Sequence, residues 1–361
     1  MKDIVFICGA RDFHAMDKYW ITAKTVYPRK VLLLTDLIES ENQPKLISTD
    51  TPVYHLFNID KLLFKKQSSF GNIWRNLIKV LVIPIQIYYL KKFYKNHADC
   101  IYHAIPMYYM MLCYLAKIPF VATPQGSEIL VRPLRSKIYR RFAVKSLQAA
   151  NSVIVDSVNM QNKVFQLSGV MPIIMKNGFN TSEILGKSLR SGRQTILSIR
   201  GFNPGYRIEK ILEGRLQSAE KLPLSFVYPA CEEDYKKRIK AEFIPEDRDL
   251  GRLDKCLLYE EMVNTLLAVS IPQSDSSPRS VYECIFAGAC VAVTESPYIH
   301  ELPKCMKERI YLVNIDDKYW FDKALIFAKK TTLTPFVPSD EALEMCDQEK
   351  TIRKIVDKIY S

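Results

Sequence analysis

The sequence predicts two α/β domains, each built on a doubly wound parallel sheet, with a cleft between them. Three observations predict this fold class. Short apolar, β-branched runs alternate with longer helical patterns, the alternation occurs in two series, and residues 177–193 between the series are rich in Asn, Ser, Gly and Lys. Strands separated by helical segments imply crossover connections and therefore parallel sheets. The 361 residues suffice for about two domains with separate cores.

Ten strands are expected, five in each series. They lie at residues 4–8, 31–35, 100–103, 119–123 and 153–156 in the first series, and at 195–199, 224–228, 266–271, 289–294 and 310–313 in the second. Short apolar runs bounded by turn residues are read as strands, and the longer patterns between them as crossover helices. A last helical pattern spans residues 340–360.

These elements predict the domain boundaries. We expect a first domain at residues 1–180, a linker at 181–193, a second domain at 194–345 and a C-terminal helix at 346–361. In open α/β sheets, ligands bind outside the carboxyl ends of the strands. Candidate functional residues are therefore sought directly after the strands.

The net charge belongs entirely to the first half of the chain. The formal charge is +12 and the sequence pI is near 9.1. Residues 1–185 hold 24 Lys and Arg against 12 Asp and Glu, whereas residues 186–361 hold 27 of each. A basic protein of this kind invites comparison with nucleic-acid binders, but no recognition motif accompanies the charge, so nucleic acid is not expected as a partner.

Two basic stretches of the first half suggest contact with an anionic membrane surface. Residues 61–97 and residues 129–150 interleave Lys and Arg with apolar residues, and neither stretch contains an acid. An anionic bilayer offers an apolar layer and attracts each nearby Lys or Arg by roughly 1 kcal/mol. The alternative is that both stretches are ordinary helices with basic solvated faces. No helix long enough to span a bilayer is expected.

The most informative stretch of the second half is residues 270–294. An expected strand ends at Pro272, a polar loop follows, and a helix is expected to begin at Pro278 with Ser277 as its cap and to stop at Gly288. A helix that starts at the carboxyl end of a strand presents free backbone N–H groups and the positive end of its dipole. Both favour a phosphate at this position.

Two acids belong to this loop and helix. Glu283 lies about a turn and a half into the helix, where its carboxylate can accept two hydrogen bonds from a ribose diol while a diphosphate binds the helix start. The alternative for Glu283 is a solvated surface residue. Asp275 lies eight positions earlier, in the loop.

Here the sequence resembles the family 4 glycosyltransferases, which are retaining enzymes of the GT-B fold with two Rossmann-like domains and a nucleotide-sugar donor. In that family two acids spaced as Asp275 and Glu283 flank this loop and helix, and the small-residue turn at 287–289 also matches. Residues 197–212, reading LSIRGFNPGYRIEKIL, look like the family variant with an arginine after the first strand of the nucleotide domain.

Further matches occur in the same order as in the family. Residues 250–253, reading LGRL, fit ahead of an expected helix, and residues 123–128, reading TPQGSE, resemble a strand-end His-Gly-x-acid motif. Asn177 and Gly178 fall where the family has Asn-Gly before the linker. The chain departs from the family in having Asp275 in place of glutamate and Gln125 in place of histidine.

The resemblance implies the site residues of the second domain. It assigns catalysis to Asp275, Arg200 and Glu283. The guanidinium of Arg200 suits phosphate and would stabilise negative charge on the leaving diphosphate. For Arg200, Arg207 and Arg279 the alternative is a surface arginine. Contacts with the donor are implied for Arg200, Tyr206, Arg207, Ser276, Ser277, Arg279, Ser280, Val281 and Glu283.

Five residues of the first domain are candidates for the acceptor side. They are Gly9, Arg11, His103, Gln125 and Glu128. Gln125 cannot act as a base. His103 ends an expected strand, and the alternative to a role in the site is a structural one.

The implied activity is that of a metal-independent hexosyltransferase that retains the anomeric configuration. The donor is a nucleotide sugar, a UDP-sugar by default, and the acceptor is a lipid-linked sugar or polysaccharide precursor. No cofactor and no metal are expected, and the acidic pair at residues 247–249 is read as a solvated loop. Two alternatives are a nucleotide-sugar epimerase of the same fold and a non-catalytic nucleotide-sugar binder. Nine cysteines without a C-x-x-C pair and the lack of a secretory signal favour a cytoplasmic location, peripheral on the inner face of the membrane.

Overall fold

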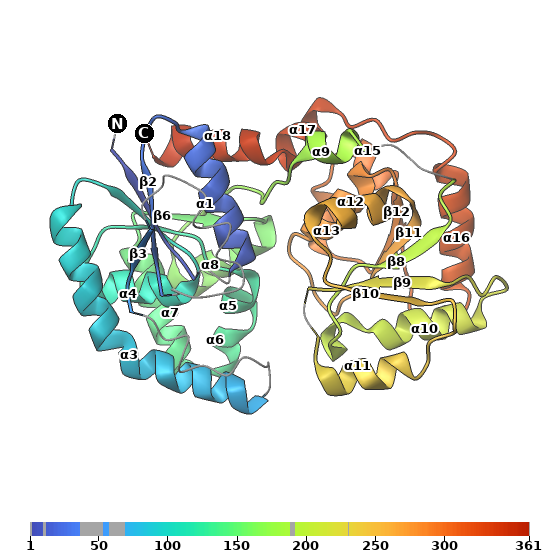
Figure 1. Cartoon of the computed structure of the whole chain (residues 1–361), viewed down its shortest axis with the longest axis horizontal. Coiled ribbons are helices and arrows are strands. Elements are labelled where there is room, and N and C mark those ends of the chain that lie inside the picture. The colour runs from blue at the N-terminus through green and yellow to red at the C-terminus, as the bar shows by residue number, and fades with distance from the viewer. Residues whose placement is uncertain are drawn as a thin grey trace. The chain divides into compact units, whose positions relative to one another are not determined.

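The computed structural model describes residues 2–9, 12–36, 53–57, 69–187, 192–229 and 231–360. The chain forms two compact units (Figure 1). The first contains Met1–Lys176 together with Glu349–Ser361, and the second contains Asn177–Gln348. As domain boundaries, the ranges 1–180, 181–193, 194–345 and 346–361 stay predictions.

The first unit is built on a parallel sheet of seven strands in the order β3-β2-β1-β4-β5-β6-β7. The strands are β1 (Ile4–Ile7), β2 (Val31–Thr35), β3 (Val53–His55), β4 (Ile101–Ala104), β5 (Val121–Ala122), β6 (Ser152–Val155) and β7 (Ile173–Ile174). The helices are α1 (Phe13–Thr25), α3 (Ser69–Asn96), α4 (Met107–Ala116), α5 (Gly126–Leu130), α6 (Arg132–Arg135), α7 (Lys137–Ala149), α8 (Val158–Ser168) and α18 (Gln348–Ile359).

The second unit holds six parallel strands in the order β10-β9-β8-β11-β12-β13. The strands are β8 (Thr195–Ser198), β9 (Leu224–Val227), β10 (Arg248–Gly251), β11 (Thr265–Ser270), β12 (Cys290–Val293) and β13 (Ile310–Leu312). The helices are α9 (Thr181–Leu185), α10 (Ile208–Gln217), α11 (Glu233–Lys240), α12 (Lys255–Val263), α13 (Arg279–Phe286), α14 (Pro297–His300), α15 (Lys304–Lys307), α16 (Trp320–Thr331) and α17 (Asp340–Cys346), with a 3-10 turn at Pro204–Tyr206.

Both sheets reverse their strand order at one point. In the first sheet the chain runs from β1 outward through β2 and β3, then returns to place β4 on the other side of β1. In the second sheet β8 is followed outward by β9 and β10, and β11 then pairs with the free side of β8. Each reversal leaves the carboxyl ends of two central strands without a crossover between them, which is where such sheets bind ligands.

The predicted fold class and all ten predicted strands are confirmed, with ends shifted by one or two residues. The sequence did not predict β3, β7 and β10, and all three are edge strands. An edge strand has a neighbour on one side only and is partly exposed, so it needs no continuous apolar run. The residues of β3, β7 and β10 are accordingly exposed or half-buried.

The acidic segment at residues 247–249 is not a solvated loop, and this prediction was wrong. Arg248 and Asp249 lie in β10, and the side chain of Asp247 is fully buried against Arg215 of α10. The guanidinium of Arg215 donates to both carboxylate oxygens of Asp247, at 2.6 and 2.5 Å. Backbone N–H groups of Leu224 and Ile244 also donate to this carboxylate. Four hydrogen bonds from three donor groups satisfy the buried charge, so Asp247 links β9 to the turn before β10.

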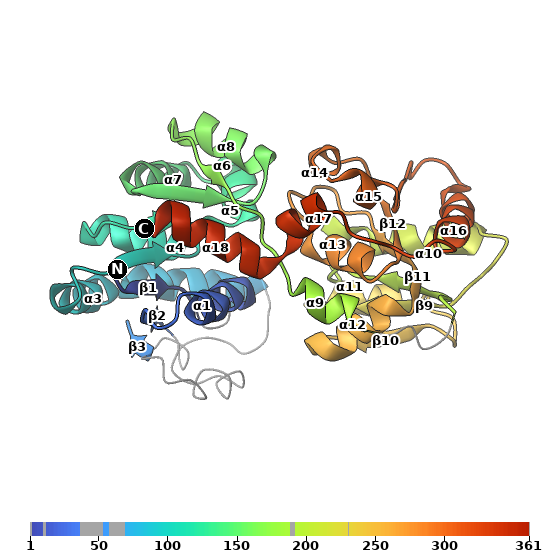
Figure 2. The same cartoon turned by 90° about the horizontal axis from the view of Figure 1, so that it is seen from above.

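The pattern at residues 340–360 forms two helices rather than one. α17 ends at Cys346, Asp347 adopts an extended conformation, and α18 begins at Gln348. Ile352 and Ile355 of α18 pack into the core of the first unit with Tyr19 of α1. Figure 2 shows α18 beside α1. The C-terminal helix therefore completes the first unit, while α17 belongs to the second.

The two segments that connect the units run side by side in the second unit. Phe179 and Asp347 form a parallel bridge, in which the Phe179 N–H donates to the Cys346 carbonyl at 2.8 Å and the Gln348 N–H donates to the Phe179 carbonyl at 3.0 Å. A Cβ at Gly178 would lie 2.6 Å from the Gln348 backbone. Gly178 therefore permits the close approach of the outgoing and returning segments.

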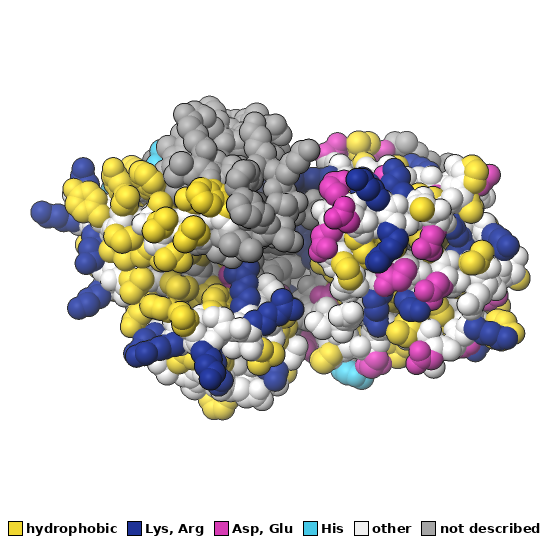
Figure 3. All heavy atoms as spheres, turned by 90° about the horizontal axis from the view of Figure 1, so that it is seen from below, with side chains coloured by type: hydrophobic (Ala, Val, Ile, Leu, Met, Phe, Trp, Pro, Cys, Tyr) yellow, Lys and Arg dark blue, Asp and Glu magenta, His cyan; other side chains and the backbone are white. Residues whose placement is uncertain are grey.

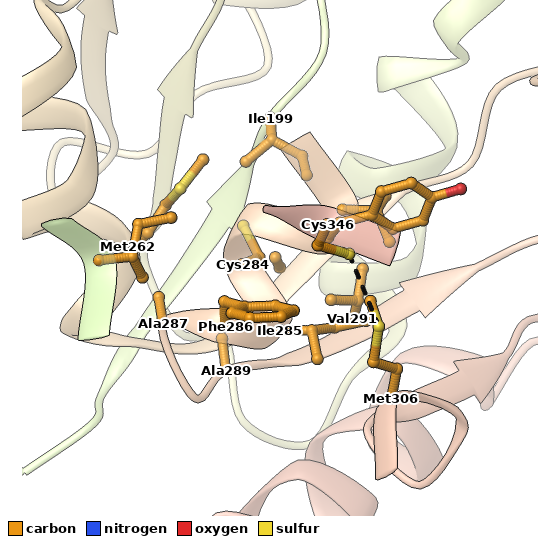
Figure 4. Close-up of a cluster of buried hydrophobic side chains, with 14 of the residues drawn as sticks. Ile199, Met262, Cys284, Ile285, Phe286, Ala287, Ala289, Val291, Met306 and Cys346 are labelled. Carbon is orange, nitrogen blue, oxygen red and sulfur yellow. Dashed lines mark hydrogen bonds between the residues drawn. The ribbon is translucent and has the colours of Figure 1, made fainter. Parts of the chain in front are cut away.

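α13 packs in the hydrophobic core of the second unit. Its residues from Val281 to Phe286 are all buried, as is typical of a helix packed on several sides. Figure 4 shows Cys284, Ile285 and Phe286 among the surrounding apolar side chains, with the Cys346 thiol directed at the Met306 sulfur, 4.0 Å away. This packing fixes the direction in which the first turn of α13 points.

Candidate functional site

The candidate site lies at the strand reversal of the second sheet. Arg200 follows β8 and Asp275 follows β11, the two strands that flank the reversal. The first turn of α13 begins at Arg279, four residues beyond Asp275. The structure therefore brings together at one sheet edge the three features that the sequence predicted separately: an arginine, an acid and a helix start.

Arg200 is held in one orientation by the strands around it. Its Nε donates to Ser270 Oγ at 2.6 Å, and its Nη2 donates to the carboxylate of Asp275. Its guanidinium carbon lies 5.8 Å from the ring centre of Tyr206. The side chains of Arg200 and Asp275 are 13% and 18% exposed, so solvent and ligands reach the pair. A guanidinium that is held in one orientation is preorganised to bind an anion through its remaining N–H groups.

The loop before α13 is ordered by Asp275 and Ser296. The Ser276 N–H donates to the carboxylate of Asp275 at 2.9 Å, and the Ser296 hydroxyl donates to the Asp275 carbonyl at 3.1 Å. Ser277 does not cap the helix as predicted. Pro278 is the N-cap residue and the Ser277 hydroxyl lies 3.4 Å from the Tyr282 hydroxyl. A cap without a side-chain acceptor leaves the first N–H groups of a helix available for a ligand.

The first turn of α13 limits which predicted residues can meet a ligand through their side chains. Val281 is fully buried and its N–H donates to the Pro278 carbonyl at 3.0 Å. Ser280 is half-buried at the helix start. The N–H group of Ser280 comes directly before that of Val281, so it is a backbone donor at the start of the helix.

Glu283 is not a solvated surface residue. It is 6% exposed, and its Oε1 accepts hydrogen bonds from the Tyr259 hydroxyl and from Arg279 Nε, both at 3.1 Å. Burial, together with the nearby charge of Glu283, raises the pKa of Tyr259 and keeps its hydroxyl a donor. Both of these bonds end on Oε1, so within the described residues Oε2 is the oxygen with capacity for a ligand.

Arg207 holds the loop after β11. Its guanidinium donates to the carbonyls of Ile271 and Pro272, at 2.6 and 2.7 Å, and to Thr294 Oγ1 at 3.2 Å. Desolvation lowers the pKa of Arg207. Three protein acceptors leave little of this guanidinium for a phosphate, and the contacts identify Arg207 as a residue that positions the loop.

Two residues that orient the proposed binding side chains were not predicted. Ser270 ends β11 and orients Arg200, and Tyr259 of α12 orients Glu283. A serine at the end of a buried strand and a tyrosine in a helix are common, so neither carried a signal in the sequence. Both act through a partner that is distant in the chain.

The first sheet has a different set of groups at its reversal. Gly9 follows β1, and a Cβ there would lie 3.0 Å from the Tyr109 hydroxyl and 3.7 Å from the Asp36 carboxylate. Gln125 precedes α5, and its side-chain amide donates to Asp12 Oδ2 at 2.5 Å. Asp12 also caps α1 by accepting from the Ala15 N–H. The sequence predicted Gly9 and Gln125 but not the acids beside them. Arg11 lies outside the described residues.

Glu128 has its carboxylate turned toward the backbone. It is buried and accepts hydrogen bonds from the N–H groups of Met107 and Gln125, at 2.9 and 3.0 Å. Nη1 of Arg132 lies 3.5 Å from Oε1 of Glu128. Burial raises the pKa of Glu128, although the backbone hydrogen bonds and the charge of Arg132 act to lower it. The motif at residues 123–128 thus forms a capping box that joins α5 to the start of α4.

His103 is enclosed by the core of the first unit. It is fully buried on β4, its Nε2 bonds to Thr123 Oγ1 at 2.7 Å, and its Nδ1 bonds to the hydroxyl of Tyr360 in the residues after α18. Burial and the nearby charge of Lys18 lower the pKa of His103 well below 6.5. Both nitrogens are used by the protein, as expected for the structural alternative.

Among the residues that the structure describes, no group of three or more His, Cys, Asp or Glu side chains lies close enough together to hold a metal ion. In the same part of the chain, no helix has the length and apolar character to cross a bilayer.

Solved structures with the same fold are numerous. HepE of Anabaena, solved in complex with UDP and glucose, superposes with a TM-score of 0.73 at 15% identity, covering 100% of both chains. Sucrose-phosphate synthase of Thermosynechococcus elongatus superposes with a TM-score of 0.71 at 12% identity, covering 99% of this chain and 98% of that one. The lipopolysaccharide outer core galactosyltransferase WaaB superposes with a TM-score of 0.64 at 11% identity, covering 99% of both chains.

No protein-family model and no curated protein matches the sequence. At these identities the similarity establishes the fold and leaves the activity to the site. Two parallel α/β sheets, matched over nearly the whole chain to glycosyltransferases of that architecture, show that the protein has the GT-B fold.

Proposed function

We propose that the protein is a glycosyltransferase that moves a sugar from a nucleotide diphosphate donor to an acceptor. The observation that carries the proposal is the pair of Arg200 and Asp275 at the strand reversal of the second sheet, next to the first turn of α13. A similar chain, HepE, was solved with UDP-glucose, with a TM-score of 0.73 at 14% identity. UDP-sugars are therefore the first donors to test.

The chemistry of the proposed step matches the charges of the site. Breaking the bond between the anomeric carbon and the diphosphate leaves the electron pair on a phosphate oxygen and positive character on the sugar. Within the described residues, Nη1 of Arg200 has hydrogen-bond capacity left, and the N–H group of Ser280 belongs to the helix start that follows the same loop. Fixed donors that meet the developing negative charge are usually the largest contribution to such catalysis. We propose no metal in this step.

The other second-unit residues take roles that follow from their contacts. Glu283 would accept the ribose hydroxyls through Oε2, and Tyr206, beside Arg200, would contact the nucleotide. Asp275 would face the donor sugar while keeping Arg200 in place. Ser276 and Ser277 belong to the same loop and would line the diphosphate. Val281 would contribute through packing and Arg207 by positioning the loop.

Retention of the anomeric configuration and a lipid-linked or polysaccharide-precursor acceptor belong to the same proposal. Their support is the sequence resemblance. For the acceptor side we propose Gly9, Gln125 and the unpredicted Asp12, which lie together at the reversal of the first sheet. Glu128 and His103 support that edge from within the unit. The proposed location is the cytoplasmic side of a membrane.

The experiment uses the purified full chain and a panel of UDP-, GDP- and ADP-sugars. We expect one donor class to raise the melting temperature and then to transfer its sugar to lipid-linked acceptors. Thermal stabilisation without transfer to any acceptor would favour a non-catalytic binder. Release of free nucleotide without an acceptor would favour an epimerase. No stabilisation by any nucleotide sugar would contradict the proposal.

A further inference from the structure

The outward face of α3 is apolar. Its exposed side chains between residues 77 and 89 recur at helical spacing and include Leu77, Val80, Leu81, Ile85, Tyr88 and Tyr89. Leu81, near the middle, is 62% exposed. A surface helix normally turns polar residues outward, because the apolar stripe is needed for the core. In α3 another face packs on the core, so among the described residues these outward side chains leave much of their apolar surface in solvent.

The inward face of α3 shows this directly. Leu90 is buried in the main core of the unit, and Ile78 and Val82 are buried in a smaller cluster with Trp74 and Phe57. Lys79 lies 4.4 Å above the ring of Tyr108 in α4, whose hydroxyl donates to the Lys79 carbonyl at 3.2 Å. The helix is thus anchored on α4 by its inner side. Its orientation on the unit is fixed independently of whatever covers the outer side.

A second exposed apolar pair lies on the neighbouring helices. Leu134 of α6 is 85% exposed and Ile138 of α7 is 72% exposed. α4 packs against both α3 and α7, so the three helices form one layer of the first unit. Figure 3 views the unit from below: hydrophobic side chains gather over α3, and Lys and Arg side chains stand around them.

The charged residues in the sequences of α3, α4, α6 and α7 are all Lys or Arg. The last turns of α3 carry Lys91, Lys92 and Lys95, and the α6–α7 segment carries Arg132, Arg135, Lys137, Arg140, Arg141 and Lys145. Residues 61–97 and 129–150 contain no acid. Glu128, the acid nearest to the α6–α7 segment in sequence, is buried and turned toward the backbone. Of the basic stretch at 61–97, residues 61–68 lie outside the described residues.

We propose that this layer docks on an anionic lipid bilayer, with α3 lying in the plane of the interface. The name α3 face is used below for Leu77, Val80, Leu81, Ile85, Tyr88 and Tyr89, with Lys91, Lys92 and Lys95 at its end. An apolar ridge with basic residues beside it matches the two layers of such a surface, acyl chains and anionic headgroups. Tyr88 and Tyr89, whose rings contact edge to face, suit the boundary between these layers.

Charge decides between a bilayer and a second copy of this chain. A symmetric dimer through the α3 face would bring the same lysines of two chains together, and like charges across an interface weaken it. A nucleic acid would satisfy the lysines but not the aliphatic side chains of Leu81 and Ile85. An anionic bilayer satisfies both. The docking requires neither donor nor acceptor, so its test is separate from that of the proposed activity.

The experiment is co-sedimentation of the full chain with vesicles of phosphatidylcholine alone and of phosphatidylcholine mixed with phosphatidylglycerol. We expect binding to the anionic vesicles that falls as salt rises. Leu81→Asp should weaken it by about 10-fold or more, because an apolar contact is lost and a repelled charge is gained. The matched control is Ile326→Asp on α16 of the second unit, where Ile326 is 68% exposed, and it should bind as the wild type does.

A second pair of variants tests the charge. Changing Lys91, Lys92 and Lys95 to Gln should weaken binding roughly 100-fold, since each lysine near an anionic surface contributes about fivefold. The control removes three lysines of the second unit, at Lys221, Lys304 and Lys330, and should change binding little. A Leu81→Trp variant supplies a spectroscopic readout, and its fluorescence should shift to the blue on anionic vesicles.

Four outcomes would overturn the proposal. They are equal binding to neutral and anionic vesicles, no binding to either, an equal loss in the Leu81→Asp and Ile326→Asp variants, and no blue shift of Leu81→Trp. Dimers that Leu81→Asp dissociates, without vesicle binding, would assign the α3 face to a second copy. Binding of RNA or DNA in place of vesicles would assign it to nucleic acid. Thermal melts of each variant establish that it is folded.

Discussion

The two strand reversals of this protein occupy the same position in two similar sheets but use their polar residues differently. In the second unit, Arg200 and Asp275 are paired with each other and remain partly exposed. In the first unit, Glu128 is bound to backbone N–H groups and His103 is enclosed by Thr123 and Tyr360. A ligand can form hydrogen bonds with a partly exposed ion pair. Groups that bond to buried protein atoms have already used their hydrogen-bond capacity.

This difference separates residues that bind from residues that support. Substitutions at the second reversal should change donor binding and leave folding nearly intact, because the pair is accessible to water. Substitutions of His103 or Glu128 should change stability, because they would leave buried partners without a hydrogen bond. The predictions below test that separation in order of expected effect.

The largest effect is expected for Arg200→Ala. The value of kcat/KM for the best donor should fall about 100- to 1000-fold, because one fixed donor to the leaving diphosphate is lost. The melting temperature should change little, since Arg200 and Asp275 are both partly exposed. Steady-state kinetics on folded enzyme measure this. Arg238→Ala, an exposed arginine of α11, is the control and should keep its activity.

The next effect is expected for Glu283→Gln. Donor affinity should fall by about 2 kcal/mol, because a charge-assisted hydrogen bond to the ribose is replaced by a neutral one. The specific test is a cycle with UDP and 2′,3′-dideoxy-UDP, measured by calorimetry. Loss of the ribose hydroxyls should weaken binding to the wild type and change binding to the variant much less. Equal losses in both proteins would remove Glu283 from the ribose.

Arg207→Met tests a residue that lies at the donor edge but resembles the supporting groups of the first unit. The free energy of unfolding should fall by about 1.5 kcal/mol, because two carbonyls and Thr294 lose a charged donor. The donor affinity of the folded variant should stay within about threefold of wild type. Chemical denaturation and calorimetry measure the two quantities. A large loss of affinity with unchanged stability would assign Arg207 to the donor instead.

The smallest effect concerns the pH dependence that His103 imposes on stability. Its folded-state pKa lies well below the unfolded value near 6.5. Below pH 6.5 the unfolded state therefore binds a proton that the folded state does not, and stability falls as pH falls. Between pH 6.5 and 5.5 the loss is about 1 kcal/mol.

The measurement for His103 is urea denaturation of the wild type and of His103→Gln across this pH range. The difference in unfolding free energy between the two proteins should narrow as pH decreases, since the variant lacks the titrating group. A difference that stays constant with pH would mean that His103 titrates normally in the folded protein. Activity per folded molecule should be unchanged if His103 is a supporting residue.

Much of the fold followed from apolar periodicity. Nine of the ten predicted strands are central, and they are continuous apolar runs because both faces of each sheet are covered, a pattern that is visible in the sequence. The edge strands β3, β7 and β10 were not predicted, because an exposed strand needs no continuous apolar run. The helix break at Asp347 was not predicted, because the residues on both sides of it favour helix. The bridge to Phe179 holds Asp347 in an extended conformation.

The sequence predicted site residues that a motif marks, and it missed residues that act through a hydrogen bond to a distant part of the chain. Arg200, Asp275 and Glu283 were predicted from the family resemblance together with their positions after strands and along one helix, and their roles stay predictions. Ser270 and Tyr259, which orient Arg200 and Glu283, come from other segments. The burial of Asp247 against Arg215 was likewise invisible, because two charges in a polar stretch look the same whether they are paired or solvated.

The sequence by itself determined the fold class, the positions of ten strands along the chain and the confinement of the excess positive charge to the first half, since each depends only on which residues follow one another. The tertiary structure decided which charges are available. Packing pairs Arg207 with carbonyls, encloses His103 and leaves the apolar face of α3 in solvent. These outcomes depend on distances between residues that are far apart in the chain, and hydrogen-bond capacity and burial are set by those distances.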